Sequence, residues 1–183
     1  MRRLPKVLNK AEAAALLGAA PGCRPSTDPR NELMLKVMLN CGLRSAELVA
    51  LRVKHLDFKE GSLFVEQGKG KKDRIVYPSK AVLRWLKQFI GKKGQDEPVF
   101  QTRNGTPVQT RYLREMVARL KKKAKIEKRV YPHLLRHTCA TNLYRNTKNI
   151  VMVQQALGHS DIRTTQIYTE VTNDELRKAM RAL

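Results

Sequence analysis

Apolar residues recur three or four positions apart over most of this 183-residue chain, and this spacing places side chains on one face of an α-helix. Residues that start or stop helices interrupt the repeats. Asp28-Pro29 is a typical helix start, and Gly42 and Gly158 follow apolar repeats as helix stops. The chain is therefore expected to be mainly helical, and its length suits one domain over residues 1–183.

One stretch departs from this helical spacing. Leu63, Val65, Ile75 and Tyr77 are typical of two β-strands, and the glycine-rich segment 68–70 between them predicts a hairpin with a basic tip. We therefore predict a mainly α domain with a small antiparallel β-sheet, in the α+β class. The expected helices span 9–19, 28–41, 45–51, 79–89, 110–125, 133–145 and 150–157, with a short one from Ser160 towards Tyr168 and a last one from 173 or 174. Ser45 is expected to cap the third of these helices, and Pro132 to stand at the start of the helix 133–145. On the helix 110–125, the residues expected to face inward are Leu113, Met116, Val117 and Leu120.

The first twenty residues resemble a secretory signal only superficially. Met1-Arg2-Arg3 precedes an alanine- and leucine-rich stretch, but Glu12 interrupts it and pairs better with Asn9 as a helix-capping pattern. Three scattered cysteines do not form a disulfide framework or a C-x-x-C zinc site. No apolar run reaches the ~18 residues that span a bilayer. We therefore expect a cytoplasmic protein with reduced thiols.

The charge of the chain points to a polyanionic partner. Lys and Arg number 37 against 16 Asp and Glu, so the formal net charge is +21. A surface this basic repels itself unless an anionic partner neutralises it, which favours nucleic acid or an anionic membrane. No terminal amphipathic helix offers a membrane anchor. Aromatic residues are only 5%, too few to favour base stacking on single strands. Double-stranded DNA is the preferred partner, and a ribosomal or other basic RNA-binding protein is the alternative.

Six polar side chains stand where the predicted structure turns or where a helix presents one face. Together they suit phosphodiester chemistry, because guanidinium groups bind non-bridging oxygens in pairs and a tyrosine hydroxyl can act as a nucleophile when cations lower its pKa. No pair of acidic residues with metal-binding spacing accompanies them, so a two-metal nuclease is disfavoured and no metal or other cofactor is expected. They are Arg44, Lys69, His133, Arg136, His159 and Tyr168.

Four segments, in order, resemble the motifs of the tyrosine recombinases, the phage integrase and Xer-type family. Residues 41–48 (CGLRSAEL) resemble its first arginine box, and 68–74 (GKGKKDR) resemble its hairpin lysine loop. Residues 133–138 (HLLRHT) resemble its H-x-x-R box, and 157–161 (LGHSD) with Tyr168 nine residues after His159 resemble its second histidine and nucleophile. The resemblance implies the fold of a DNA breaking-rejoining enzyme catalytic domain.

The resemblance also implies a mechanism. Tyr168 would attack the scissile phosphate, form a 3′-phosphotyrosyl link and release a 5′-hydroxyl. Arg44 and Arg136 would hold the non-bridging oxygens, and Lys69 would protonate the leaving oxygen. The covalent link conserves the energy of the broken bond, so strands would be rejoined without ATP or metal.

Supporting roles are expected for further residues. His133 would assist proton transfer, His159 would hydrogen-bond the phosphate, and Glu47 matches an acidic residue that supports the site. His137 is expected to be structural and to face away from Arg136. Lys71 or Lys72 could replace Lys69 if the hairpin shifts by a residue. Contacts to duplex phosphates are expected from Lys71, Lys72 and Arg74.

Domain organisation and assembly follow from the same resemblance. Most members carry an N-terminal DNA-binding domain, whereas residues 4–8 resemble the start of the catalytic domain, so we expect a single catalytic domain without the core-binding domain. Both a cut fragment and a naturally short member fit this pattern. Leu176, Met180 and Leu183 resemble a C-terminal helix that docks onto a neighbouring protomer. We expect a monomer that assembles on DNA as a dimer or tetramer at the nucleoid, with accessory recombination proteins allowed as further partners.

Two other functions share some of these features. A type IB topoisomerase-like enzyme would nick and reseal DNA by the same chemistry, and only exchange of partner strands separates it from a recombinase. A non-catalytic DNA-binding regulator derived from a recombinase would retain the fold. The complete set of six candidate residues argues against that regulator, and covalent trapping of DNA would test it directly.

Overall fold

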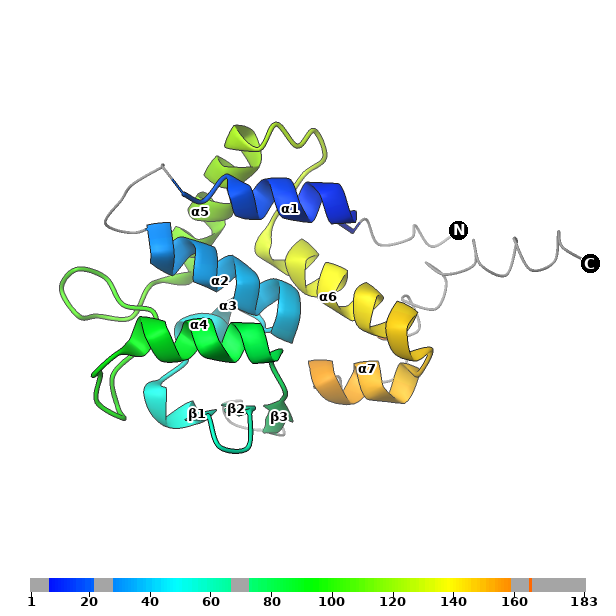
Figure 1. Cartoon of the computed structure of the whole chain (residues 1–183). Helices are drawn as coiled ribbons and strands as arrows, with labels where there is room; N and C mark the ends of the chain where they lie inside the picture. The colour runs from blue at the N-terminus through cyan, green and yellow to red at the C-terminus, as the bar shows by residue number, and fades with distance from the viewer. Residues whose placement is uncertain (1–6, 22–27, 67–72, 159–164, 166–183) are drawn as a thin grey trace, which may run out of the picture.

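The computed structural model describes residues 7–21, 28–66, 73–158 and 165, and within these it is mainly helical with one small sheet (Figure 1). This confirms the predicted fold class. The strands are β1 (Leu56–Asp57), β2 (Ser62–Val65) and β3 (Arg74–Val76). The helices are α1 (Lys10–Gly18), α2 (Asp28–Cys41), α3 (Ser45–Val49), the 3₁₀ turn η1 (Val53–His55), α4 (Lys80–Ile90), α5 (Thr110–Lys123), α6 (Pro132–Thr147) and α7 (Ile150–Leu157).

Helix boundaries follow the residues that predicted them. The Asn9 side chain accepts a hydrogen bond from the Glu12 backbone N–H at the start of α1, and the Glu12 carboxylate accepts one from the Asn9 N–H. Pro132 is the first residue of α6. Gly42 and Gly158 adopt φ values of +62° and +64°, the left-handed region that glycine enters at low cost, and they end α2 and α7.

The third helix differs from its prediction at both ends. Arg44, rather than Ser45, is its N-cap residue, and the Arg44 backbone N–H donates to the Glu47 carboxylate over 2.7 Å. The helix ends at Val49 instead of Leu51, because the Leu51 carbonyl accepts a hydrogen bond from the Val99 N–H outside the helix.

The sheet has the order β1-β2-β3, with antiparallel neighbours. The predicted pair of strands, β2 and β3, is confirmed. The strand β1 was not predicted, because two residues are too few to show the alternation of apolar and polar side chains that marks a strand. On β3 the buried residues are Arg74 and Val76, whereas Ile75 is 53% exposed, and Tyr77, directly after the strand, is 72% exposed. The sheet therefore turns an arginine, and not only apolar side chains, towards the body of the domain.

The core forms around α2. This helix packs against α1, α4 and α6, and it lies between α1 and α4 in Figure 1. The inward residues predicted on α5 (Leu113, Met116, Val117 and Leu120) are all fully buried. The packing brings the C-terminal ends of α2 and α7 together beside α6, where polar side chains gather. No described helix is long and apolar enough to cross a membrane.

Candidate active site

Three arginines surround one carboxylate at the meeting point of α3, β3 and α6. The Glu47 carboxylate, whose side chain is 7% exposed, lies 2.6 Å from Arg44 Nη1. Both Glu47 oxygens bind the Arg74 guanidinium, at 2.8 Å each, and Oε2 lies 3.8 Å from Arg136 Nη1. Residues from separate parts of the sequence therefore share one charged centre, which we call the Glu47 cluster: Arg44, Glu47, Arg74 and Arg136.

The Glu47 cluster keeps its carboxylate ionised. Burial alone would raise the pKa of Glu47, but hydrogen bonds from the Arg74 side chain and from the Arg44 backbone, with the positive charge of Arg74, lower it to about 2. The carboxylate is therefore negative at all physiological pH values. One negative and three positive groups leave the cluster with a net positive charge, which suits an anionic ligand.

Arg44 is the more accessible of the two arginines expected to bind phosphate. Its side chain is 34% exposed, and Nη2 donates to the Gly158 carbonyl over 3.3 Å. This contact joins the first arginine box to the residue directly before His159. The expected position of Arg44, in the turn between two helices, is confirmed.

Arg136 lies deeper, with 1% of its side chain exposed. Nη1 donates to the Gly42 carbonyl and Nη2 to the Leu157 carbonyl, both over 2.7 Å. Buried polar groups of this kind are costly unless they are paired, so these bonds fix where the ends of α2 and α7 lie relative to α6. Arg136 thus holds together the segments that carry the first arginine box and the second histidine box.

His133 lies on the exposed side of α6, one turn before Arg136 and His137. Its ring packs edge-on against that of His137, with centroids 4.4 Å apart and an angle of 78°. Contact with the protein desolvates part of the His133 ring and, with the charges of Arg136 and Arg44, lowers its pKa below the ordinary value of 6.5. His133 is therefore mainly neutral near pH 7 and retains a nitrogen that can accept a proton.

Acidification is expected to destabilise the fold through His137. Burial, followed by the charges of His133 and Arg136, lowers the pKa of His137 from 6.5 to about 4. The unfolded chain therefore binds a proton at His137 more readily than the folded domain does. The contribution of the neutral ring to the free energy of unfolding is complete above pH 6.5 and is lost as the pH falls towards 4. At pH 5 the loss in the free energy of unfolding is at most about 2 kcal/mol, because part of the ring is exposed and solvent screens the charges around it. Urea denaturation at pH 8 and pH 5 measures it, and His137→Gln should lose that part of the pH dependence. An unchanged pH dependence in His137→Gln would contradict this assignment.

Arg74 does not lie where the sequence placed it. We expected a contact to duplex phosphates, but its side chain is 6% exposed and its guanidinium binds Glu47 and, through Nε, the Ala156 carbonyl at 3.0 Å. The reason is the register of β3, which turns Arg74 inward opposite Val65. In this structure Arg74 is buried inside the Glu47 cluster instead of facing solvent.

Five predicted residues lie outside the described part of the chain: Lys69, Lys71, Lys72, His159 and Tyr168. The segment 67–72 ends two residues before Arg74, and His159 directly follows Gly158. In the sequence, the first segment therefore ends two residues before a member of the Glu47 cluster, and His159 directly follows a residue that contacts Arg44. The described part of the chain has no group of three or more His, Cys, Asp or Glu side chains that could hold a metal ion.

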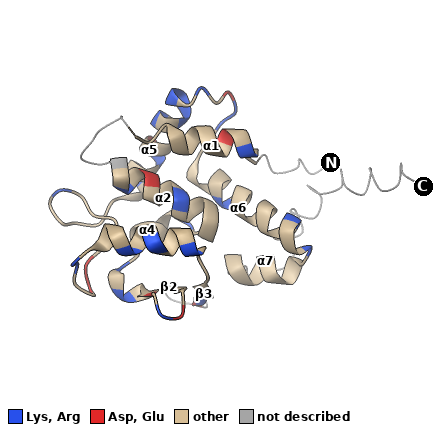
Figure 2. Ribbon diagram, viewed as in Figure 1, with Lys and Arg blue, Asp and Glu red and all other residues tan. Residues whose placement is uncertain are grey.

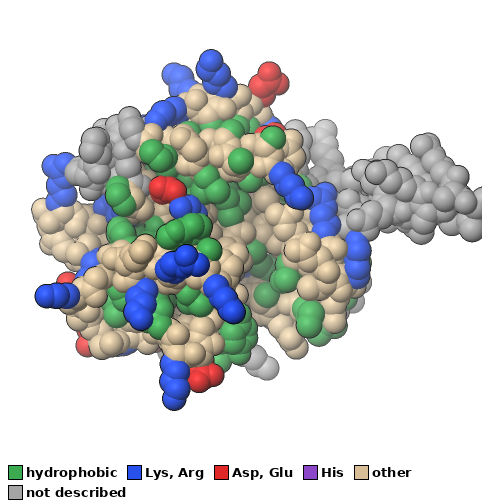
Figure 3. Space-filling view, in the orientation of Figure 1, with side chains coloured by type: hydrophobic (Ala, Val, Ile, Leu, Met, Phe, Trp, Pro, Cys, Tyr) green, Lys and Arg blue, Asp and Glu red, His purple; other side chains and the backbone are tan. Residues whose placement is uncertain are grey.

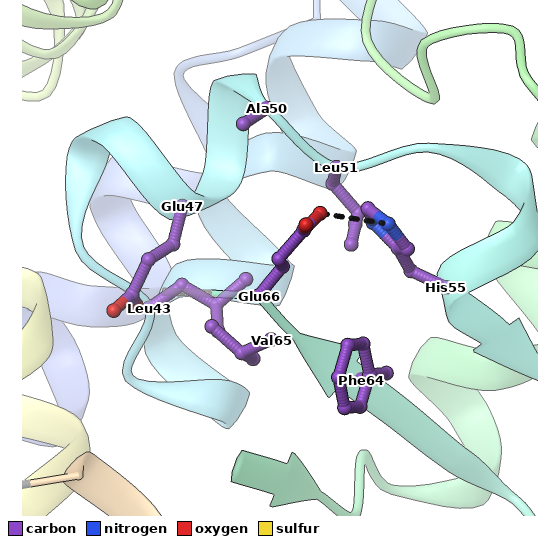
Figure 4. Close-up of a pocket in the computed structure, with 8 residues that line it drawn as sticks. All are labelled: Leu43, Glu47, Ala50, Leu51, His55, Phe64, Val65 and Glu66. Atoms are coloured by element: carbon purple, nitrogen blue, oxygen red, sulfur yellow. Dashed lines mark ion pairs between the residues drawn. The ribbon is translucent and has the colours of Figure 1, made fainter. Parts of the chain in front are cut away.

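A pocket of about 240 Å³ lies beside Glu47, between α3, η1 and β2 (Figure 4). Its wall includes Leu43, Leu51 and Phe64, and an ion pair joins His55 Nε2 to Glu66 Oε2 over 3.7 Å. Burial lowers the pKa of His55, although the Glu66 charge opposes this. The lining of this pocket includes the acidic side chains of Glu47 and Glu66 and no lysine or arginine, which does not suit an anionic ligand.

Basic side chains also dominate the outer surface. Figure 2 shows Lys and Arg on most helices and loops, with far fewer acidic residues, and Figure 3 shows them projecting over α4 and around the rim of the face in view. This distribution is consistent with the net charge of +21. A polyanion could therefore contact the domain well beyond the Glu47 cluster.

Comparisons with known proteins agree with this arrangement. The model of the phage integrase family matches residues 6–175. Tyrosine recombinase XerD of Staphylococcus aureus is 36% identical over 184 aligned residues, which cover 97% of this chain and 62% of XerD. The chain therefore spans about three-fifths of that relative.

Solved structures agree as well. The crystal structure of XerA recombinase superposes with a TM-score of 0.84 at 33% identity, covering 100% of this chain and 66% of that one. The structure of XerH site-specific recombinase bound to a palindromic difH substrate, a post-cleavage complex, has a TM-score of 0.80 at 27% identity over 97% of this chain and 53% of XerH. From its sequence and its fold, the chain belongs to the phage integrase family of tyrosine recombinases.

Proposed function

We propose that this chain is the catalytic domain of a site-specific DNA recombinase or integrase. It would cleave and rejoin double-stranded DNA through a 3′-phosphotyrosyl intermediate. The observation that carries the proposal is the convergence of Arg44 and Arg136 on Glu47, with Gly158 bound to Arg44 directly before His159. Two guanidinium groups held by one carboxylate provide a fixed site for a phosphate that gains charge during the reaction.

In the proposed reaction, the Tyr168 oxygen forms a bond to phosphorus while the bond from phosphorus to the 5′-oxygen breaks. Arg44 and Arg136 stabilise the charge on the non-bridging oxygens, and His159 donates a hydrogen bond to the same phosphate. Lys69 gives its proton to the leaving 5′-oxygen. His133, neutral near pH 7, assists removal of the tyrosine proton. Reversal with another 5′-hydroxyl rejoins the strands.

Double-stranded DNA is the proposed substrate. The net charge of +21 and the basic surface support it, and the similar XerH structure is described as bound to its difH substrate. Phosphate contacts by Lys and Arg make such binding strongly dependent on salt. We further propose assembly of two or four copies on DNA through the C-terminal residues 173–183, and action at the nucleoid.

Covalent trapping tests the proposal. A labelled duplex with a nick beside the cleavage position loses its short 5′-hydroxyl fragment after cleavage, so the adduct cannot revert. Because the target sequence is unknown, a pool of random duplexes at low salt is used. We expect a protein–DNA adduct on a denaturing gel with the wild type and none with Tyr168→Phe.

Tyr77→Phe is the matched control for this experiment. Tyr77 directly follows β3, is 72% exposed and lies outside the Glu47 cluster, so removal of its hydroxyl should leave adduct formation unchanged. Tight DNA binding without an adduct in the wild type would contradict the proposal and favour a non-catalytic DNA-binding protein. Once an adduct is found, transfer of the held strand to a second duplex separates recombination from nicking and resealing.

A further inference from the structure

Arg74 is a buried arginine whose role the proposed reaction does not explain. It begins β3, two residues after the segment expected to carry a catalytic lysine, and only 6% of its side chain is exposed. Its Nη1 and Nη2 atoms each donate to a different Glu47 oxygen over 2.8 Å, and Nε donates to the Ala156 carbonyl over 3.0 Å. All three nitrogens therefore already have partners within the protein.

These bonds connect elements that are distant in the sequence. Glu47 lies on α3 and Ala156 in the last turn of α7, and the bond to Ala156 spans 82 positions of the chain. Glu47 in turn binds Arg44 through both its backbone N–H and its guanidinium. A planar guanidinium can bind both oxygens of one carboxylate in a fixed orientation, which a lysine ammonium cannot do.

The two-oxygen bond from Arg74 sets how Glu47 meets Arg44. Glu47 Oε1 receives both Arg74 Nη1 and Arg44 Nη1, while Oε2 receives Arg74 Nη2 and the Arg44 backbone N–H. Without Arg74, the carboxylate would keep Arg44 Nη1 at 2.6 Å and the more distant Arg136 Nη1 at 3.8 Å, and it could turn to bind both terminal nitrogens of Arg44. That change would draw the Arg44 guanidinium away from the position in which it meets a phosphate.

We propose that Arg74 is a positioning residue for DNA cleavage: it acts through Glu47 to hold the Arg44 guanidinium, and through Ala156 to hold the end of α7, without touching DNA. This inference rests on the proposed function, since it assigns Arg74 a part in that reaction. Arg44, with 34% of its side chain exposed, is the member of this chain of contacts that meets the phosphate. Small errors in the placement of such a group lower reaction rates strongly.

The test compares Arg74→Met and Arg74→Lys with the wild type in single-turnover cleavage, at saturating concentrations of a duplex on which the wild type forms the adduct. Both variants should lose about 10- to 100-fold in the cleavage rate constant, because neither side chain can bind two carboxylate oxygens. DNA affinity and its salt dependence should be unchanged. If Arg74 instead contacted a phosphate directly, Arg74→Met would reduce the steepness of the plot of log K for DNA binding against log salt concentration by about 0.9.

Arg30→Met is the matched control for loss of stability. Arg30 is also buried, at 9% exposure, and donates to the Gln101 carbonyl over 2.7 Å, but it lies at the opposite end of α2 from Gly42. Its cleavage rate should equal that of the wild type below the melting temperature. Arg74→Lys, which retains the charge, keeps the test valid if Arg74→Met does not fold.

A double variant tests the route through Glu47. If Arg74 acts through that carboxylate, Glu47→Gln combined with Arg74→Met should cleave no more slowly than the slower of the two single variants. Wild-type rates in both Arg74 variants would overturn the inference, as would a reduced salt slope or an equal loss of rate in Arg30→Met. Absence of any wild-type adduct would instead overturn the proposed function, and the inference with it.

Discussion

Replacement of Arg44 by alanine is expected to lower the rate of DNA cleavage about 10²–10³-fold, the usual cost of removing one donor to a charge that develops in a transition state. The fold should remain nearly as stable as the wild type. Arg44 is partly exposed, and Glu47 keeps its two bonds to Arg74 when Arg44 is removed. Ion pairs of this exposure contribute about 0–1 kcal/mol.

Arg136→Ala provides the contrast. The loss of rate should be similar, but the variant should also lose stability, since Arg136 is buried and ties the ends of α2 and α7 through two carbonyls. Single-turnover cleavage and urea denaturation of both variants measure the two effects separately. Equal losses of stability in Arg44→Ala and Arg136→Ala would contradict this division of roles.

Replacement of Glu47 by alanine is expected to cause the largest loss of stability in the domain, about 3–5 kcal/mol. The change leaves Arg74 and Arg136 buried beside each other without their shared negative partner. Because a domain is usually stable by only about 5–15 kcal/mol, the variant should be close to unfolding, and cleavage should be lost. Urea denaturation at pH 7 measures the change.

The pH dependence of the wild type tests the same carboxylate independently. The pKa of Glu47 is about 2 in the folded domain against 4.5 ordinarily. The charged carboxylate therefore contributes fully to the free energy of unfolding above pH 4.5, and this contribution is lost as the pH falls through 2.

Glu32→Ala is the control for Glu47→Ala, because Glu32 forms a more exposed pair with Lys36 at 2.6 Å. The control should lose less than about 1 kcal/mol in the free energy of unfolding. An equally small loss in Glu47→Ala would contradict the central place of this carboxylate in the cluster.

The sequence predicted those elements whose boundaries depend on local chemistry. The capping pair Asn9 and Glu12, the proline at position 132 and the glycines at 42 and 158 act within a few residues of themselves, so a single sequence is enough to find them. The position of Arg44 in a turn followed in the same way. Its three-residue spacing from Glu47, which matches an N-cap and N3 pair, was a further signal.

Features that depend on contacts between distant residues were not predicted. Arg74 was expected to contact duplex phosphates from a basic hairpin, whereas its burial depends on β3 pairing with β2 in one register and on a carboxylate 27 positions earlier. The depth of Arg136 depends on carbonyls at the ends of two other helices. Burial of an arginine on a short strand would be costly without a partner for its charge. Glu47 is that partner, and only the fold brings it next to Arg74.

The most direct test of the central claim is to identify the residue and the DNA end that are joined in the trapped adduct. Trypsin cuts after Arg163 and Arg177, so the peptide 164–177 contains Tyr168 as its single tyrosine. Mass spectrometry of the digested adduct should find the nucleotide remnant on this peptide, linked through a 3′-phosphate, with a free 5′-hydroxyl on the released fragment. A remnant on another peptide, or a link through a 5′-phosphate, would contradict the proposed mechanism.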